Sequence, residues 1–125
     1  MNKIELLKAE HHAKGWGEEV WFINTELYCG KLLKFNEGAS FSDHFHVLKD
    51  ETWYVLEGEF ELRHYDLTNA DRLISKLGPG DVVHITPSTP HQLTALTAGT
   101  LIEVSTTHNE SDSYRIGKGD SQSSK

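Results

Sequence analysis

The sequence predicts an all-β domain, either a sandwich or a small barrel, and three observations lead to this fold class. From residue 19 onward the chain consists of short runs rich in Val, Ile, Thr, Tyr, Phe and Trp. Gly, Pro, Asn and Asp residues close these runs and favour turns. The connections are short, as is usual between antiparallel strands. We therefore expect strands over residues 20–24, 27–35, 39–46, 51–56, 59–67, 73–76, 82–85, 91–95 and 100–106.

The composition fits one globular domain and excludes several classes of protein. The chain has 125 residues, of which 37% are hydrophobic, which is enough for one packed core. Its 12 basic and 19 acidic residues give a net charge of −7 without a basic stripe, so we expect no nucleic-acid partner. No apolar run is long enough for a membrane span or a secretory leader, so we expect a cytoplasmic protein with no membrane partner.

The ends of the chain differ from its middle. Residues 1–18 fit neither the helical nor the strand period cleanly, and we expect an N-terminal extension or an added edge strand there. We expect residues 19–116 to form the barrel. Residues 117–125 carry no apolar side chain able to compensate for ordering, which predicts a flexible tail.

Four residues in the middle of the chain have the spacing of a metal site. His44 and His46 are two apart in a strand-like run, so both side chains leave the same face, roughly 6.5 Å apart along the strand. A hairpin after them would bring Glu51 beside the pair. His91 opens a later strand that a closed barrel can place across from the first three. Cys29 is the single cysteine, so we expect one divalent ion, Zn, Fe, Mn, Co or Ni, on imidazole and carboxylate ligands.

These positions resemble the first motif of the cupin superfamily. That motif is Gly, five residues, His-any-His, three or four residues, Glu, six residues, Gly. Gly38, His44, His46, Glu51 and Gly58 match it without exception. The resemblance implies a double-stranded β-helix, the cupin jelly-roll barrel, with the metal ligands His44, His46, Glu51 and His91.

The second cupin motif is met only in part. Gly80 and His91 fit it, whereas Thr86, Ser88 and Ala95 stand at its Pro, Gly and Asn positions. Because the departures fall on turn and supporting residues, they put the local backbone geometry in doubt more than the metal site.

The strand period indicates which side chains face the barrel interior. If Glu51 points inward, Trp53 and Val55 do so too, and Tyr54 and Leu56 point outward. An inward Trp53 can serve as a platform for a sugar or small acid, or it can simply fill the core. In the last strand the inward set is either Leu101, Glu103 and Ser105 or Ile102 and Val104, which leaves two roles open for Glu103: solvated or functional.

Residues 101–115 indicate which group of cupins the chain resembles. They are similar to the end of the cupin domain in type II mannose-6-phosphate isomerases and related sugar-phosphate proteins, where an Ile-Glu-Val strand precedes an acidic stretch and an Arg. The resemblance implies that Arg115 clamps an anion and that Glu103 carries a proton. A surface pairing of Arg115 with Asp112 is the alternative.

Three functions follow from this set of residues. The first is a metal-dependent isomerase or epimerase of a sugar or sugar phosphate, with Glu103 or His84 as the base, since His84 lies on a strand that ends near the site. The second is an Fe(II)-dependent small-molecule dioxygenase with the same ligands. The third is a non-catalytic module that holds a carbohydrate or small acid through the metal and Trp53.

Other surface features bear on partners. We expect a homodimer formed through an N-terminal strand or an outer sheet face that carries Val20, Phe22, Tyr54 and Leu56. The remaining histidines, His11, His12, His64 and His108, have no obvious ligand partners, and we expect them to be ordinary core or surface residues.

Overall fold

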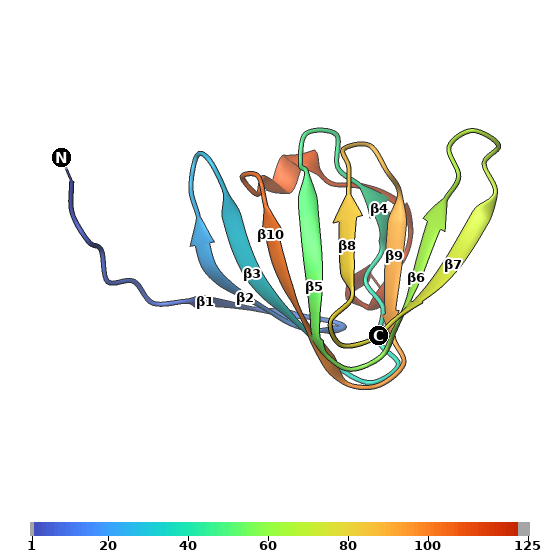
Figure 1. Cartoon of the computed structure of the whole chain (residues 1–125), viewed down its shortest axis with the longest axis horizontal. Helices are drawn as coiled ribbons and strands as arrows, with labels where there is room; N and C mark the ends of the chain where they lie inside the picture. The colour runs from blue at the N-terminus through green and yellow to red at the C-terminus, as the bar shows by residue number, and fades with distance from the viewer. Residues whose placement is uncertain (1, 123–125) are drawn as a thin grey trace.

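Two antiparallel sheets face each other across a hydrophobic core in the computed structural model, which describes residues 2–122 (Figure 1). The first sheet has the strand order β1-β2-β3-β10-β5-β8 and the second β11-β4-β9-β6-β7. The strands are β1 (Glu10–Lys14), β2 (Gly17–Asn24), β3 (Cys29–Phe35), β4 (Asp43–Phe45), β5 (Glu51–Glu57), β6 (Phe60–Tyr65), β7 (Arg72–Leu77), β8 (Val82–Ile85), β9 (His91–Ala95), β10 (Gly99–Ser105) and β11 (Tyr114–Gly117). The all-β prediction is confirmed.

The expected strands differ from the observed ones mainly around the site. The run 39–46 contains only the short β4 and an isolated bridge between Ser40 and Thr94. β11 was not expected, although it pairs with β4 and completes one edge of the second sheet. At the other end of the chain, β1 is an edge strand of the first sheet, one of the two forms expected for residues 1–18.

The inward and outward faces of β5 and β10 follow the strand period. Trp53 and Val55 are 1% and 0% exposed, whereas Tyr54 is exposed. In β10, Leu101 and Glu103 are buried, so Glu103 faces the interior and its solvated alternative is excluded. The core is filled by Trp16, Leu33, Phe35, Ala39, Phe41, Trp53, Val55, Phe60, Leu62, Leu77, Ile85, Leu93, Ala95 and Leu101.

The expected hairpin between His46 and Glu51 is wrong. β4 pairs with β9 and β11, whereas β5 lies in the other sheet between β10 and β8. Residues 46–50 cross from one sheet to the other, and the carboxylate of Asp112 supports the crossing by accepting the backbone N–H groups of residues 47–49 at 2.9 to 3.2 Å. Residues 47–49 have no partner strand, so their backbone N–H groups need other hydrogen-bond acceptors. The buried carboxylate of Asp112 supplies them.

Backbone conformation explains the glycines of the first motif. Gly38 and Gly58 have φ angles of 78° and 91°, where residues with a Cβ are strained. A Cβ at Gly58 would also lie 2.6 Å from the Cα of Gly99. Ser88, at the Gly position of the second motif, takes the same left-handed region with φ 65°. The departure from the motif therefore keeps the turn and places a strained residue in it.

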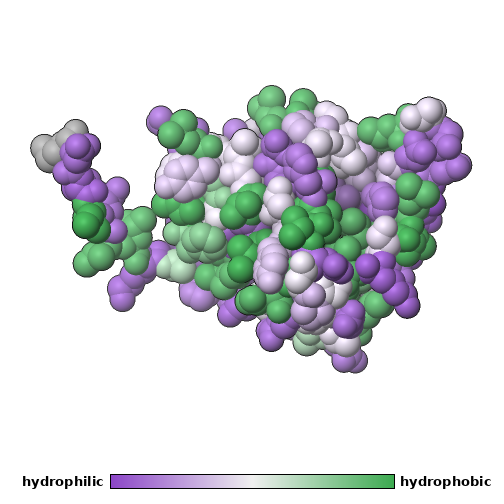
Figure 2. Space-filling view, in the orientation of Figure 1, coloured by the Kyte–Doolittle hydropathy of each residue, from purple (hydrophilic) through white to green (hydrophobic). Residues whose placement is uncertain are grey.

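The N-terminal segment extends away from the barrel (Figure 1). Residues 2–9 form neither strand nor helix, and the side chains of Ile4 and Leu6 are 92% and 95% exposed. Figure 2 shows apolar surface along this segment. Of the outward residues expected at a dimer face, Phe22 is exposed, but Val20 is buried, so the expectation for Val20 is wrong. Residues 2–122 contain no helix of the length and hydrophobicity that a membrane crossing requires.

The C-terminal segment folds back against the barrel, where it contacts Ser40 and Gly15. Asp120 bonds Ser40 twice, through its carboxylate and its own N–H, at 2.8 and 2.9 Å. The hydroxyl of Ser121 accepts the N–H of Gly15 at 3.0 Å. Residues 117–122 are thus hydrogen-bonded to the barrel, residues 123–125 lie outside the described part, and the flexibility of this tail in solution stays a prediction.

Candidate metal centre

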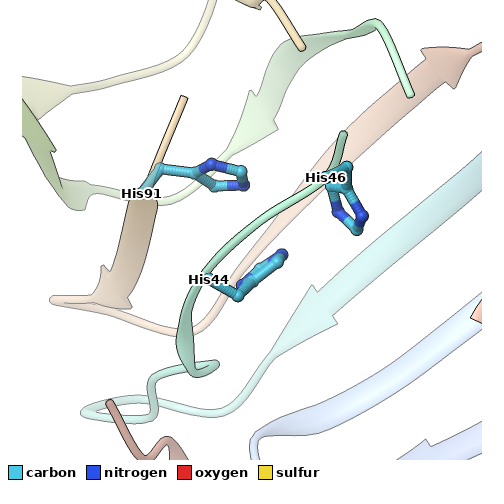
Figure 3. Close-up of side chains that lie close together, drawn as sticks. All are labelled: His44, His46 and His91. Atoms are coloured by element: carbon cyan, nitrogen blue, oxygen red, sulfur yellow. The ribbon is translucent and has the colours of Figure 1, made fainter. Parts of the chain in front are cut away.

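Three imidazole rings converge inside the barrel (Figure 3). His44 lies on β4 and faces its register partner His91 on β9, with ring centroids 4.6 Å apart. His46 follows β4 directly, and its ring lies 4.9 Å from that of His44. The nitrogen atoms that the three side chains offer all lie within 4.8 Å of one another. A single ion could therefore contact all three rings.

Backbone carbonyls orient each ring. Nδ1 of His44 lies 2.6 Å from the carbonyl oxygen of Ser42, that of His46 2.9 Å from Asp112, and that of His91 2.9 Å from Thr89. A carbonyl oxygen only accepts, so Nδ1 of each neutral ring carries the proton and donates it. Nε2 is then left with its lone pair directed at the common centre, the form in which imidazole binds a metal.

Glu51 is not part of this three-histidine cluster, but its carboxylate approaches the cluster from the opposite sheet. Its Oε2 lies 3.5 Å from Nε2 of His46 and 4.0 Å from Nε2 of His91. Its Oε1 accepts the indole N–H of Trp53 at 2.8 Å, which fixes the carboxylate. Within the described chain, Oε2 of Glu51 and Nε2 of His91 are buried without a hydrogen-bond partner. Two unpartnered buried acceptors that face each other fit a divalent cation between them.

Burial also sets the protonation of these groups. It lowers the pKa of His44, His46 and His91 to about 4 each, so the rings are neutral near pH 7. Burial, together with the charge of Glu103, raises the pKa of Glu51 to about 8. A cation bound here would remove this penalty, because it replaces a proton on the carboxylate.

The pocket above the centre has a volume of about 180 Å³ and a strongly charged wall. The Nζ atom of Lys49 lies 2.8 Å from Oε2 of Glu103, and both side chains are 5% exposed or less. Burial alone would raise the pKa of Glu103, but the charges of Lys49 and Lys31 outweigh burial and lower it to about 2. Glu103 therefore lies in the pocket, which is one of the two alternatives that the sequence left open, and as the carboxylate of an ion pair it is a weak base.

Of the other residues that the sequence singled out, Arg115 and Trp53 line the pocket and His84 does not. Arg115 lines the pocket and is the register partner of His44, and Asp112 holds the 47–49 backbone instead of pairing with it. His84 lies outside this pocket, where it is exposed and bonds Asp50 at 2.7 Å. Trp53 lines the pocket but is 1% exposed, so it positions Glu51 and has little surface for a sugar.

Sequence reasoning missed Lys31, Lys49 and His108. Lys31 is 2% exposed and reaches Glu19 at 3.3 Å, and His108 lines the same pocket. The strand period held a signal for Lys31, because Lys31 lies two residues before the inward Leu33 on β3 and shares its face. Lys49 lies in the crossing formed by residues 46–50, outside any strand, so the strand period held no signal for it. For His108, which follows the last long strand, the sequence held no such signal.

Fold and site together define a small all-β barrel with a three-histidine candidate metal site in its interior. The family model of the cupin domain matches residues 31–106. The chain belongs to the cupin family. Among curated proteins, no sequence match is found.

Solved structures agree with this fold. The structure of oxalate decarboxylase from Bacillus subtilis at pH 4.6 is 17% identical, has a TM-score of 0.74, and matches over 86% of this chain and 30% of its own. A structure from work on the Mn(II) centers of the same enzyme has a TM-score of 0.75, and an arginine-to-alanine variant one of 0.77, both at 17% identity and the same two coverages. The chain thus spans less than a third of that protein's length, and the likeness is one of fold.

Proposed function

We propose that this chain is a metal-dependent cupin that acts on a small sugar or sugar phosphate as an isomerase or epimerase. One observation carries the metal part of the proposal. Nε2 of His91 and Oε2 of Glu51 come from opposite sheets, are buried, and find no hydrogen-bond partner in residues 2–122. A buried acceptor without a hydrogen bond destabilises the folded protein, and coordination of an ion by these two atoms would offset that cost.

The four ligands suit several divalent ions, namely Zn, Fe, Mn, Co and Ni. Mn(II) is the first to test because oxalate decarboxylase, which shares the fold, has Mn(II) centers. When bound, a divalent ion supplies the polarisation of a carbonyl or hydroxyl oxygen. The protein's part is to hold His44, His46, Glu51 and His91 in place and to shield the reacting carbons from water.

The rim of the pocket supports a phosphorylated ligand. Arg115 and Lys14 line the mouth, and neither makes an ion pair with any carboxylate of the described residues within 4.0 Å. Guanidinium and ammonium groups without anionic partners are suited to a phosphate. At about 180 Å³ the pocket holds the reacting end of a sugar and leaves a phosphate at this rim.

Metal analysis tests the first half of the proposal. Protein purified without chelator should hold one ion per chain, and His91→Ala should lose it. His84→Ala is the matched control, since His84 is exposed and lies outside the pocket. Equal metal content in wild type and His91→Ala would refute the ligand set.

Proton exchange tests the second half. In an isomerase working through an enediolate, Glu103, the candidate base that lines the pocket, would take the hydrogen beside the carbonyl as a proton and exchange it with solvent. Aldose and ketose phosphates incubated in D₂O should therefore gain deuterium in an NMR spectrum. Oxygen uptake by the Fe(II) form without exchange would favour a dioxygenase. Ligand binding without either would favour a binding module, and both results would contradict the isomerase.

A further inference from the structure

Two buried ammonium groups meet at one nitrogen atom beside the candidate metal centre. Nζ of Lys31 and Nζ of Lys49 lie 3.2 and 3.4 Å from Nδ1 of His108. The two lysines are 2% and 4% exposed. Burying two like charges side by side is costly unless anions compensate for them.

The lysines belong to the same wall as the ligand-bearing strands. Across the inner face of the first sheet, Lys31 is the register partner of Glu103, and Glu103 is the register partner of Trp53. Trp53 in turn holds Glu51. Lys49 precedes Glu51 by two residues and lines the same pocket. The ammonium groups therefore line the pocket into which a metal ion on the three histidines would face.

The charged side chains that line the pocket leave a positive excess once a divalent ion is bound. The cationic side chains are those of Lys14, Lys31, Lys49 and Arg115, and the carboxylates are those of Glu19, Glu51, Glu103 and Glu110. A divalent ion would leave an excess of two positive charges in a largely buried space. An anionic ligand is the natural compensation, although the protein as a whole carries a net charge of −7.

Lys49 also has a donor to spare, and the third donor of Lys31 faces only an aromatic ring. An ammonium group has three N–H donors. In the described chain Lys49 directs two of them to Glu103 and His108. Lys31 directs two to Glu19 and His108, and its third side faces the ring of Trp21, 4.5 Å from the centroid. His108 is held neutral because burial and the two lysines lower its pKa, so it accepts from them without adding a charge.

We infer that Lys31 and Lys49 form an anion subsite beside the metal position, which takes the charged oxygen of a small organic acid or enediolate whose neighbouring oxygen binds the metal. The inference rests on the proposed function and specifies which part of the ligand this wall recognises. It fits an isomerase in which the metal would hold the hydroxyl oxygen, because the negative charge then develops on the neighbouring carbonyl oxygen when an enediolate forms.

Oxalate is a suitable probe, because two of its oxygens can contact a metal and the other two remain for the lysines. Titration calorimetry of the Mn(II)-loaded protein at pH 8 should show that Lys31→Met weakens oxalate binding by about tenfold or more, the effect of losing a hydrogen bond between charged groups. Lys34→Met is the matched control, since Lys34 lies on the same strand and is exposed. Imidazole, a neutral metal ligand, should bind both variants and the wild type alike.

A second variant changes affinity in the opposite direction. Glu19→Gln removes the carboxylate that competes for Lys31 and keeps a hydrogen-bond acceptor for Trp21, so oxalate should bind more tightly. Equal oxalate affinity in wild type, Lys31→Met and Glu19→Gln, with metal content unchanged, would overturn the anion subsite alone. A wild-type protein that takes up no metal would instead overturn the proposed function, and the subsite with it.

Discussion

Removing Lys49 should destabilise the barrel far more than removing a surface ion-pair partner. Lys49→Met leaves the carboxylate of Glu103, 4% exposed, without the ammonium that lies 2.8 Å away. Breaking a buried pair on one side costs about 3 to 5 kcal/mol. Because Lys31 is the register partner of Glu103 and its charge persists in the variant, we expect the lower end, about 3 kcal/mol, or a fall in Tm of about 10 °C for a chain of this size.

Urea unfolding of the metal-free protein measures this loss. Arg63→Met is the comparison, because Nε of Arg63 lies 3.7 Å from Glu61 and the two side chains are 38% and 27% exposed. That variant should lose less than about 1 kcal/mol. The double variant Lys49→Met, Glu103→Leu should be more stable than Lys49→Met alone, since it buries no uncompensated charge. A Lys49→Met protein as stable as Arg63→Met would refute the reasoning.

Three further results are expected. The free energy of unfolding of the metal-free protein should peak near pH 6.5. Below pH 6.5 the unfolded chain protonates its histidines, whereas His44, His46 and His91 stay neutral in the folded chain down to about pH 4, so stability falls with pH. Above pH 6.5 the protein loses stability as pH rises toward 8, because the folded pKa of the Glu51 carboxyl group is raised to about 8. Stability unchanged between pH 4 and 6.5 would contradict the buried neutral rings. Ser88→Gly should raise the free energy of unfolding by roughly 0.5 to 1 kcal/mol in urea titrations, because it relieves a left-handed Ser; a loss would show that the serine is needed. Light scattering should give the mass of two chains for the whole protein and of one after deletion of residues 2–9, whose exposed apolar side chains need a cover.

The sequence was sufficient to predict that His44, His46 and His91 converge, but not how the chain brings Glu51 beside them. The spacing of His44, His46 and Glu51 picks out the converging side chains, because alternation along a strand is local. Whether residues 46–50 form a hairpin or cross to the other sheet depends on Asp112, which lies far along the chain and satisfies their N–H groups. A long-range contact of this kind leaves no trace in local spacing.

The buried lysines were missed for a different reason. Lysine is among the residue types least often buried, so composition argues against placing Lys31 and Lys49 in the interior. They are tolerated there because Glu19 and Glu103 compensate them pairwise. The strand period alone would have placed Lys31 correctly, and the general rule about burial outweighed it. Lys49 lies in the crossing between the sheets, where no strand period applies.

The three departures from the second cupin motif are compatible with an intact site because backbone atoms make most of the supporting contacts. At Ser88 the N–H donates to the carbonyl of His46, a bond that any non-proline residue can make. At Ala95 the N–H and the carbonyl bond residues 39 and 38, so the side chain takes no part. Only Thr86 acts through its side chain, whose hydroxyl lies 3.0 Å from that of Thr89, and the carbonyl of Thr89 fixes the ring of His91. Substitution of Thr86 should therefore disturb the metal ligand more than substitution of Ala95 by a residue of similar size.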